Sequence, residues 1–323
     1  MPDASIVIVT RNRKAVAKDA VRSALAQRGD VEVVLIDDGS TDGTHQDLRD
    51  EFPDPRLTVH RFDQQEGYIV QRNRGARLAA APVVFSIDDD AVFNDPDVVA
   101  DVLRLFGHPR VGAILIPFHN CRPGEDGNLI TAVAPDDGQV YVTNTFVGTA
   151  YAVRRDVFLR LGGFQEFLYH WAEETEFCQR LLGAGFVVRI GTRPSIRHYP
   201  GMVAGKYSRK VNRYISRNRL VTIWLNAPGS YLVPLWLAHH LMTLREMVRR
   251  PSEAATAAEG VAMAYGRAGR AWKLRRPMPR RAFALWLKLR KRKSVNLAEI
   301  EADLPPIARD AAPGMVAVGA EHA

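Results

Sequence analysis

The sequence predicts an α/β protein with a mostly parallel sheet and helices on both faces. Through the first ninety residues, short apolar runs rich in β-branched residues alternate with amphipathic helical patterns. The runs are nearly continuous in apolar character, as strands buried on both faces are. Acidic residues directly follow two of the runs, at Asp37 and Asp88. Open parallel sheets bind ligands beyond the carboxyl ends of their strands, so we expect a binding site at that edge.

The elements follow one another in a regular order up to residue 87 and less regularly afterwards. The expected strands are 5–10, 31–36, 57–62, 83–87, 111–117 and 186–190. The expected helices are 15–25, 41–52, 68–80, 173–182 and 207–225, with Gly183 and Gly185 ending the fourth of them. The stretch 123–138 is rich in Pro, Gly and Asp and is expected to be a mobile surface loop. No internal repeat is visible.

Length, composition and charge exclude several classes of protein. The 323 residues are enough for one large α/β domain with an appendage. Hydrophobic residues make up 46% of the chain and charged residues 25%, a composition that is typical of folded, non-membrane domains. The net charge is +8, but residues 267–293 alone hold twelve Lys or Arg and no acid. The remainder is therefore mildly acidic, which argues against a uniformly basic nucleic-acid-binding protein.

Cysteine usage and the first residues bear on the compartment. Cys121 and Cys178 are the two cysteines and lack C-x-x-C spacing, so neither a disulfide framework nor a zinc site is indicated. The chain begins without the charged start and apolar run of a signal peptide. We expect a cytoplasmic protein.

The triplet Asp88-Asp89-Asp90 is the first signal of chemistry. Adjacent carboxylates repel one another unless a cation compensates them, and oxygen ligands suit Mg²⁺ or Mn²⁺. A solvated acidic turn is the alternative. Asp37-Asp38-Gly39-Ser40 is a second acidic strand end, where helix capping explains part of the pattern and a carboxylate facing a base or ribose would explain the rest.

Four segments, in this order and spacing, resemble the family-2 glycosyltransferases. They are SIVIVTRNR, VVLIDDGSTDGT, QRNRGARLAAAPVVFSIDDDA and WAEETEFCQRLLGAGF, and the resemblance extends from Ser5 to Tyr199. It implies the GT-A fold, a Rossmann-like α/β domain that binds a nucleotide-diphosphate sugar. It also implies transfer with inversion and a divalent metal, Mn²⁺ or Mg²⁺.

The resemblance also assigns roles to individual residues. The residues implied to bind the nucleotide sugar are Thr10, Asn12, Asp38, Arg72, Asp88 and Asp89, with Asp38 at the base and Asp88 toward ribose or sugar. The residues implied to hold the metal are Asp90, the last position of the D-x-D signature, and His198. A lone histidine is more often structural, and a charge such as Arg72 can simply lie on a helix surface; both alternatives stay open.

The pair Glu173-Glu174 resembles the Glu-Asp pair of the family, whose second acid is the catalytic base. Here that acid is Glu174, one methylene longer than the usual Asp, and Glu173 is the next candidate. A helix N-terminus favours the ionised carboxylate, as a general base requires. The alternative is that both acids only complement the helix dipole. Trp171 could stack on an acceptor sugar or belong to the core.

These residues predict transfer of a sugar from a UDP- or dTDP-sugar to a hydroxyl of a glycan or lipid-linked glycan, as in cell-envelope polysaccharide synthesis. A sugar nucleotidyltransferase is one alternative, but VTRNRKA stands where its Gly-rich triphosphate loop would be. A non-catalytic nucleotide-sugar-binding protein is the other, and it would not need the two glutamates.

We expect three regions: the catalytic domain 1–226, a helical basic region 227–293 and a flexible tail 294–323. Residues 267–293 join Trp272, Phe283, Trp286 and Leu287 to the basic cluster, which suits anionic lipid headgroups. The Leu- and Trp-rich segment 231–244 is too short an apolar run to span a membrane and could lie flat at an interface. A peripheral position on the inner face of the cell membrane is the resulting prediction. Nucleic acid is a less favoured partner, and a solvated helix is the alternative.

Overall fold

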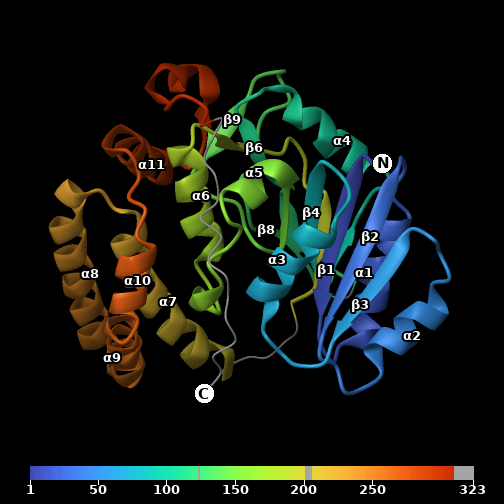
Figure 1. Cartoon of the computed structure of the whole chain (residues 1–323), viewed down its shortest axis with the longest axis horizontal. Coiled ribbons are helices and arrows are strands. Elements are labelled where there is room, and N and C mark those ends of the chain that lie inside the picture. The colour runs from blue at the N-terminus through green and yellow to red at the C-terminus, as the bar shows by residue number, and fades with distance from the viewer. Residues whose placement is uncertain (123, 201–205, 309–323) are drawn as a thin grey trace.

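The computed structural model describes residues 1–122, 124–200 and 206–308 and has a nine-stranded central sheet (Figure 1). The order of its strands is β13-β9-β11-β6-β10-β4-β1-β2-β3. Their bounds are β1 Ala4–Thr10, β2 Val31–Asp38, β3 Leu57–Phe62, β4 Val83–Asp88, β6 Val111–Leu115, β9 Tyr141–Thr143, β10 Ala150–Arg154, β11 Val187–Ile190 and β13 Val295–Asn296. All of these strands except β9 and β10 run in the same direction, which confirms the mostly parallel sheet.

Strand register places the acidic strand ends side by side. Thr10 is the partner of Asp37 across β1 and β2, and Val9 is the partner of Asp88 across β1 and β4. Parallel neighbours present their carboxyl ends at one edge of the sheet. Both acidic segments of the sequence therefore meet at that edge.

Helices cover both faces of the sheet, as predicted. One face carries α1 (Lys14–Leu25), α2 (Thr44–Glu51), α4 (Val98–Arg104) and α11 (Arg280–Arg292). The other carries α3 (Tyr68–Leu78), α5 (Arg155–Arg160), α6 (Glu173–Gly183) and α7 (Lys206–Asn226). Alternate residues of β1 divide between the two cores, with Ile6 and Ile8 on one side and Val7 on the other. This is the two-sided burial that the apolar strands predicted.

A small second sheet was not predicted. Its order is β5-β12-β7-β8, with β5 Ala91–Phe93, β7 Phe118–Asn120, β8 Asn128–Leu129 and β12 Ile196–His198. Strands of two or three residues are too short to show a periodic pattern in the sequence. This sheet places His198 next to the end of β4, because His198 pairs with Ala91.

The C-terminal part continues with helices α8 (Gly229–Arg249), α9 (Pro251–Tyr265) and α10 (Ala268–Leu274) beside α7. Figure 1 shows α8, α9 and α10 on the side of α7 that faces away from β1–β3. Within the described ranges, no helix is both long and apolar enough to cross a membrane.

Two C-terminal expectations differ from the structure. The predicted flexible tail begins at residue 294, yet β13 pairs with β9, and Ile300 and Leu304 are buried; residues 309–323 of that tail lie outside the described ranges. Phe283 and Trp286, which we expected at a lipid surface, are 3% and 5% exposed. They lie on the apolar side of α11, where they pack into the core. The proposed boundary between 226 and 227 stays a prediction.

Candidate active site

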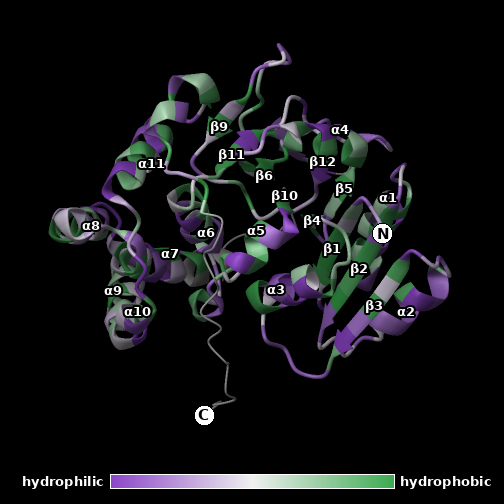
Figure 2. Ribbon diagram, turned by 45° about the horizontal axis from the view of Figure 1, so that its top comes forward, coloured by the Kyte–Doolittle hydropathy of each residue, from purple (hydrophilic) through white to green (hydrophobic). Residues whose placement is uncertain are grey.

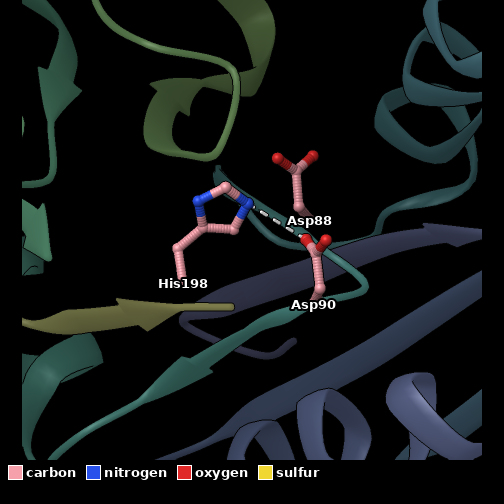
Figure 3. A group of neighbouring side chains, drawn as sticks. All are labelled: Asp88, Asp90 and His198. Carbon is pink, nitrogen blue, oxygen red and sulfur yellow. Dashed lines mark ion pairs between the residues drawn. The ribbon is translucent and has the colours of Figure 1, made fainter. Parts of the chain in front are cut away.

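Two carboxylates and an imidazole form a cluster beyond the end of β4 (Figure 3). Asp88, Asp90 and His198 each offer a ligand atom, and these atoms lie within 4.8 Å of one another. Nε2 of His198 is 3.2 Å from Oδ1 of Asp90, and Nδ1 of His198 is 2.7 Å from Oδ1 of Asn120. The imidazole is thus fixed from its far side, as the histidine ligands of metal sites are.

Arg13 is the main counter-charge of the acidic triplet. Its guanidinium donates to Asp89 and to Asp90, each at 2.7 Å, and Thr10 donates its hydroxyl to Asp89 at 2.7 Å. Burial raises the pKa of Asp89 to about 7 against the opposing charge of Arg13. For Asp90, burial is outweighed by hydrogen bonds from His198 and Arg13, which lower its pKa. Asp89 therefore points into the protein, whereas Asp90 belongs to the group of Asp88, Asp90 and His198.

Arg72 connects the acidic triplet to the glutamate pair. It is 7% exposed, and its Nη2 donates to Oδ1 of Asp88 at 2.6 Å and to the Gly148 carbonyl at 2.9 Å. Its Nη1 lies 3.5 Å from Oε1 of Glu173. The alternative of a helix-surface charge is therefore wrong for Arg72. A buried guanidinium with these partners keeps two acidic elements of the site at a fixed separation.

The two glutamates differ in accessibility. Glu173 is fully buried, and Glu174 is partly exposed. A Cβ atom at position 148 would clash with Oε1 of Glu174 and lie 2.8 Å from Nη1 of Arg72, so the glycine there lets both side chains approach. Among the two acids, Glu174 is the one that a substrate can reach.

Burial, rather than the helix dipole, dominates the titration of both glutamates. Desolvation raises the pKa of Glu174 against the opposing charge of Arg72. For Glu173, desolvation and the charge of Glu174 both raise the pKa. The helix N-terminus does favour the ionised carboxylates through backbone amides, but burial outweighs it, so the expected net direction of the pKa shift is wrong. A raised pKa makes Glu174 a stronger base once it is ionised.

The segment before α6 is strained. Tyr169, Trp171 and Ala172 have φ of 61°, 68° and 74°, in the left-handed region that favours glycine. Each such residue costs on the order of 1 kcal/mol and persists where surrounding structure imposes it. Trp171 is 42% exposed, so of the two alternatives for it, membership of the core is wrong.

Asn218 of α7 holds this strained segment. Its Nδ2 lies 2.5 Å, 2.7 Å and 3.1 Å from the carbonyl oxygens of Trp171, His170 and Leu168. Asn218 is fully buried, and the Trp171 amide donates to the Tyr68 hydroxyl at 2.9 Å. The residues just before the glutamate pair are thereby fixed from both α7 and α3.

Asp38 and Asn12 organise the loops at the neighbouring strand ends. Both oxygens of Asp38 accept backbone amides, from Glu66 at 2.9 Å and Gly67 at 3.0 Å, and the residue is 4% exposed. The side chain of Asn12 accepts the Thr41 amide at 2.8 Å. The base contact implied for Asp38 and the donor contact implied for Asn12 stay predictions.

The structure thus brings Thr10, Arg72, Asp88, Asp89, Asp90, His198, Glu173 and Glu174 to one edge of the main sheet. Sequence reasoning missed Arg13, Asn120 and Asn218. For Arg13 a signal existed: β1 and β4 are parallel neighbours, so residues that follow β1 must lie near residues 89 and 90. The contacts of Asn120 with His198 and of Asn218 with residues 168–171 are long-range, and no local pattern reveals them.

The model of the family described as Glycosyl transferase family 2 matches residues 5–158. The match includes the acidic triplet and ends before α6, so the glutamate pair and His198 lie outside it.

Relatives with partial similarity carry glycosyltransferase names. A validoxylamine A glucosyltransferase of Streptomyces hygroscopicus subsp. jinggangensis is 36% identical over 122 residues, which are 36% of this chain and 28% of that protein. A glucosyl-dolichyl phosphate glucuronosyltransferase of Haloferax volcanii is 30% identical over 159 residues, 45% of this chain and 50% of that protein. The chain thus matches about a quarter to a half of the length of these relatives.

Solved structures resemble the whole chain. The mannosyltransferase PcManGT from Pyrobaculum calidifontis, in complex with GDP-Man and Mn²⁺, has a TM-score of 0.54 at 21% identity and covers 94% of this chain and 84% of its own. S. aureus TarS 1–349 in complex with UDP-GlcNAc has a TM-score of 0.56 at 15% identity, covering 89% and 92%. These likenesses show a shared GT-A fold. The chain therefore carries a glycosyltransferase domain of family 2 on a GT-A fold.

Proposed function

We propose that this protein is a metal-dependent, inverting glycosyltransferase that moves a sugar from a nucleotide-diphosphate donor to an acceptor hydroxyl. The observation that carries the proposal is the placement of Glu174, a partly exposed carboxylate, beside Arg72 and the acidic edge of the sheet. The match of residues 5–158 to a glycosyltransferase family supports the transfer reaction.

The donor atoms at the strand end fit a divalent cation. Two carboxylates and one imidazole within 4.8 Å of one another are ligands that Mn²⁺ accepts, and carboxylates alone suit Mg²⁺. Asp90 and His198 would hold the ion, with Asp88 beside them. When bound, the ion would act as a Lewis acid that stabilises charge on a diphosphate leaving group.

Glu174 is the base in this proposal. The acceptor oxygen attacks the anomeric carbon, its proton passes to the Glu174 carboxylate, and the bond from that carbon to the diphosphate oxygen breaks. The nucleoside diphosphate leaves with the electron pair. One displacement inverts the anomeric configuration. Burial favours this role, because a base with a raised pKa accepts a proton more readily near neutral pH.

Arg72 and Arg13 have supporting roles. Arg72 orients Asp88 and sets the distance between the triplet and the glutamates. Arg13 offsets part of the negative charge of Asp89 and Asp90 and so lowers the repulsion that a diphosphate would meet at this edge. Such fixed charges stabilise developing negative charge without reorganising during the reaction.

The names of relatives support the sugar-transfer setting of the donor and acceptor that we propose. We place a UDP- or dTDP-hexose as donor and a hydroxyl of a glycan or lipid-linked glycan as acceptor. Relatives carry the names validoxylamine A glucosyltransferase, succinoglycan biosynthesis protein ExoU and glucosyl-dolichyl phosphate glucuronosyltransferase. Cell-envelope polysaccharide synthesis is the setting that we propose.

A screen of nucleotide sugars tests the proposal. The full chain is incubated with UDP-, dTDP- and GDP-sugars plus Mn²⁺, and nucleoside diphosphate release and melting temperature are measured. One class of donor should be hydrolysed slowly and should raise the melting temperature by mass action. Pyrophosphate exchange with sugar phosphate and nucleoside triphosphate would indicate a nucleotidyltransferase instead. Stabilisation without hydrolysis or transfer to any acceptor would indicate a binding protein.

A further inference from the structure

Helix α8 exposes a continuous apolar stripe. The stripe consists of Val233, Leu237, Leu241, Leu244 and Val248, whose exposed fractions are 68%, 49%, 57%, 58% and 73%. Both views in Figures 1 and 2 place α8 at an outer edge of the molecule. A surface helix of a globular protein normally turns such residues toward the core.

The spacing of these residues is helical. They follow one another at intervals of four, four, three and four, which at about 100° per residue confines them to an arc of roughly 80°. His239, on the other side of the helix, is buried, and Leu232 and Leu235 pack against the core. The helix therefore has two apolar sides. One packs against the protein core, and the other is exposed to solvent.

An aromatic pocket continues the stripe at its first residue. Val233, Leu232 and Trp236 of α8 line it together with residues of the neighbouring helices, which are Trp224, Tyr265, Ala268 and Trp272. Trp236, Tyr265 and Trp272 are 37%, 47% and 49% exposed, and the Trp236 indole donates to the Tyr265 hydroxyl at 2.9 Å. Amphipathic rings of this kind are enriched where an apolar phase meets water.

The surrounding charge is strongly positive. Residues 229–293 hold fifteen Lys or Arg and three acidic residues. Arg245 and Arg249 follow the stripe at its edge on the same helix, and both are exposed. On α10, which lines the pocket, Arg270 and Lys273 are exposed as well. An apolar stripe with a cationic border is complementary to acyl chains beneath anionic headgroups.

We infer that α8 and its aromatic pocket are a docking surface for an anionic lipid bilayer, with the helix lying in the plane of the interface. A second copy of the chain would bring two such positive regions together, which like-charge repulsion opposes. Nucleic acid would pair with the arginines and leave the stripe in water. The inference does not depend on sugar transfer.

The surface agrees in part with the one that the sequence predicted. That prediction used the aromatics of residues 267–293, of which Phe283 and Trp286 are buried and Trp272 is exposed. It also placed the Leu- and Trp-rich segment 231–244 flat at an interface, and most of the stripe on α8 lies in that segment. The basic segment supplies part of the charge.

Vesicle sedimentation of the full chain tests the surface. Intact protein should sediment with vesicles of phosphatidylcholine and phosphatidylglycerol and less with phosphatidylcholine alone, and 1 M salt should weaken the binding. The double variant Leu237→Ser/Leu241→Ser should lower the partition coefficient at least tenfold. Arg245→Gln/Arg249→Gln should lower it on anionic vesicles, by about fivefold for each arginine.

The matched control is Val16→Ser/Leu78→Ser, which removes two apolar side chains that are 37% and 44% exposed on α1 and α3. It should sediment like the intact protein. Melting curves of all variants show that each is folded. Equal sedimentation of the stripe variant and the control, or no sedimentation of the intact protein, would overturn the inference.

Sedimentation velocity without lipid distinguishes an interface between two copies of the chain from a lipid-binding surface. A dimer of the intact protein that the stripe variant abolishes would assign α8 to a second copy and contradict the bilayer. Loss of donor hydrolysis in the screen above leaves this inference intact, because sedimentation does not require activity.

Discussion

Nε2 of His198 lies 3.2 Å from Oδ1 of Asp90, and the small second sheet creates this contact. His198 ends β12 and pairs in register with Ala91, the residue after Asp90. Oδ1 of Asn120, opposite His198 on β7, then accepts from the other ring nitrogen. The imidazole is thus positioned by backbone pairing rather than by a local motif.

The contact predicts how the cation site responds to substitution. Binding of Mn²⁺ in the presence of a nucleoside diphosphate, followed by electron paramagnetic resonance, should weaken strongly in Asp90→Ala. Asn120→Ala should weaken it about tenfold or more, since loss of an orienting partner of a ligand typically costs 10- to 100-fold. Full activity of the intact protein in excess chelator would contradict the metal assignment.

Arg72 is predicted to be a large contributor to stability. Arg72→Ala removes the buried guanidinium that pairs with Asp88 and donates to the Gly148 carbonyl, and loss of such a charged hydrogen-bond donor typically costs about 1.5 to 3 kcal/mol. Arg74→Ala on the same helix is the control, because Arg74 and its partner Glu66 are both partly exposed and such pairs contribute about 0 to 1 kcal/mol. Urea unfolding measures both. Equal effects of the two substitutions would refute the central position of Arg72.

The buried carboxyl of Glu173 predicts a direction of pH dependence. Its folded-state pKa is raised by burial above the unfolded value, so its contribution to stability is complete below the unfolded pKa and is lost as pH rises through the folded pKa. The free energy of unfolding of the intact protein should therefore fall between about pH 5 and pH 9 relative to that of Glu173→Gln. Parallel pH profiles of the two proteins would show that Glu173 ionises normally.

Asn218 is predicted to be a positioning residue. Asn218→Asp keeps the size but removes the donor to the carbonyls of Leu168, His170 and Trp171, so the strained segment should relax. We expect kcat for transfer to fall by more than tenfold while the KM for donor stays within a few-fold. Asn212→Asp, closer to the start of the same helix, where its amide donates to Glu253 of α9, is the control. A loss of stability with an unchanged kcat would assign Asn218 to folding alone.

The catalytic half of the fold could be predicted from the sequence because its strands are long and apolar. Bounds such as Leu57–Phe62 agree with the prediction, and the acidic residues after β2 and β4 located the edge that carries the site. Parallel strands impose this outcome, since their carboxyl ends meet at one edge.

The remaining features depend on contacts between distant segments. The burial of Phe283 and Trp286 follows from docking of α11 on the sheet, and a pattern of aromatics beside cations does not distinguish that from a lipid surface. The pKa direction at Glu174 was mispredicted for the same reason: the helix N-terminus is visible in sequence, whereas desolvation by tertiary packing is not.

The rate of sugar transfer by Glu174→Gln tests the central claim most directly. The donor identified by the screen is used at saturation with a verified acceptor, and Glu174→Asp, which restores the usual acid of the family, is the matched control. If Glu174 is the base, Glu174→Gln should lower kcat by about 10²- to 10⁴-fold with donor affinity nearly unchanged, and Glu174→Asp should retain much more activity. A Glu174→Gln protein that transfers sugar at close to the intact rate would contradict the account.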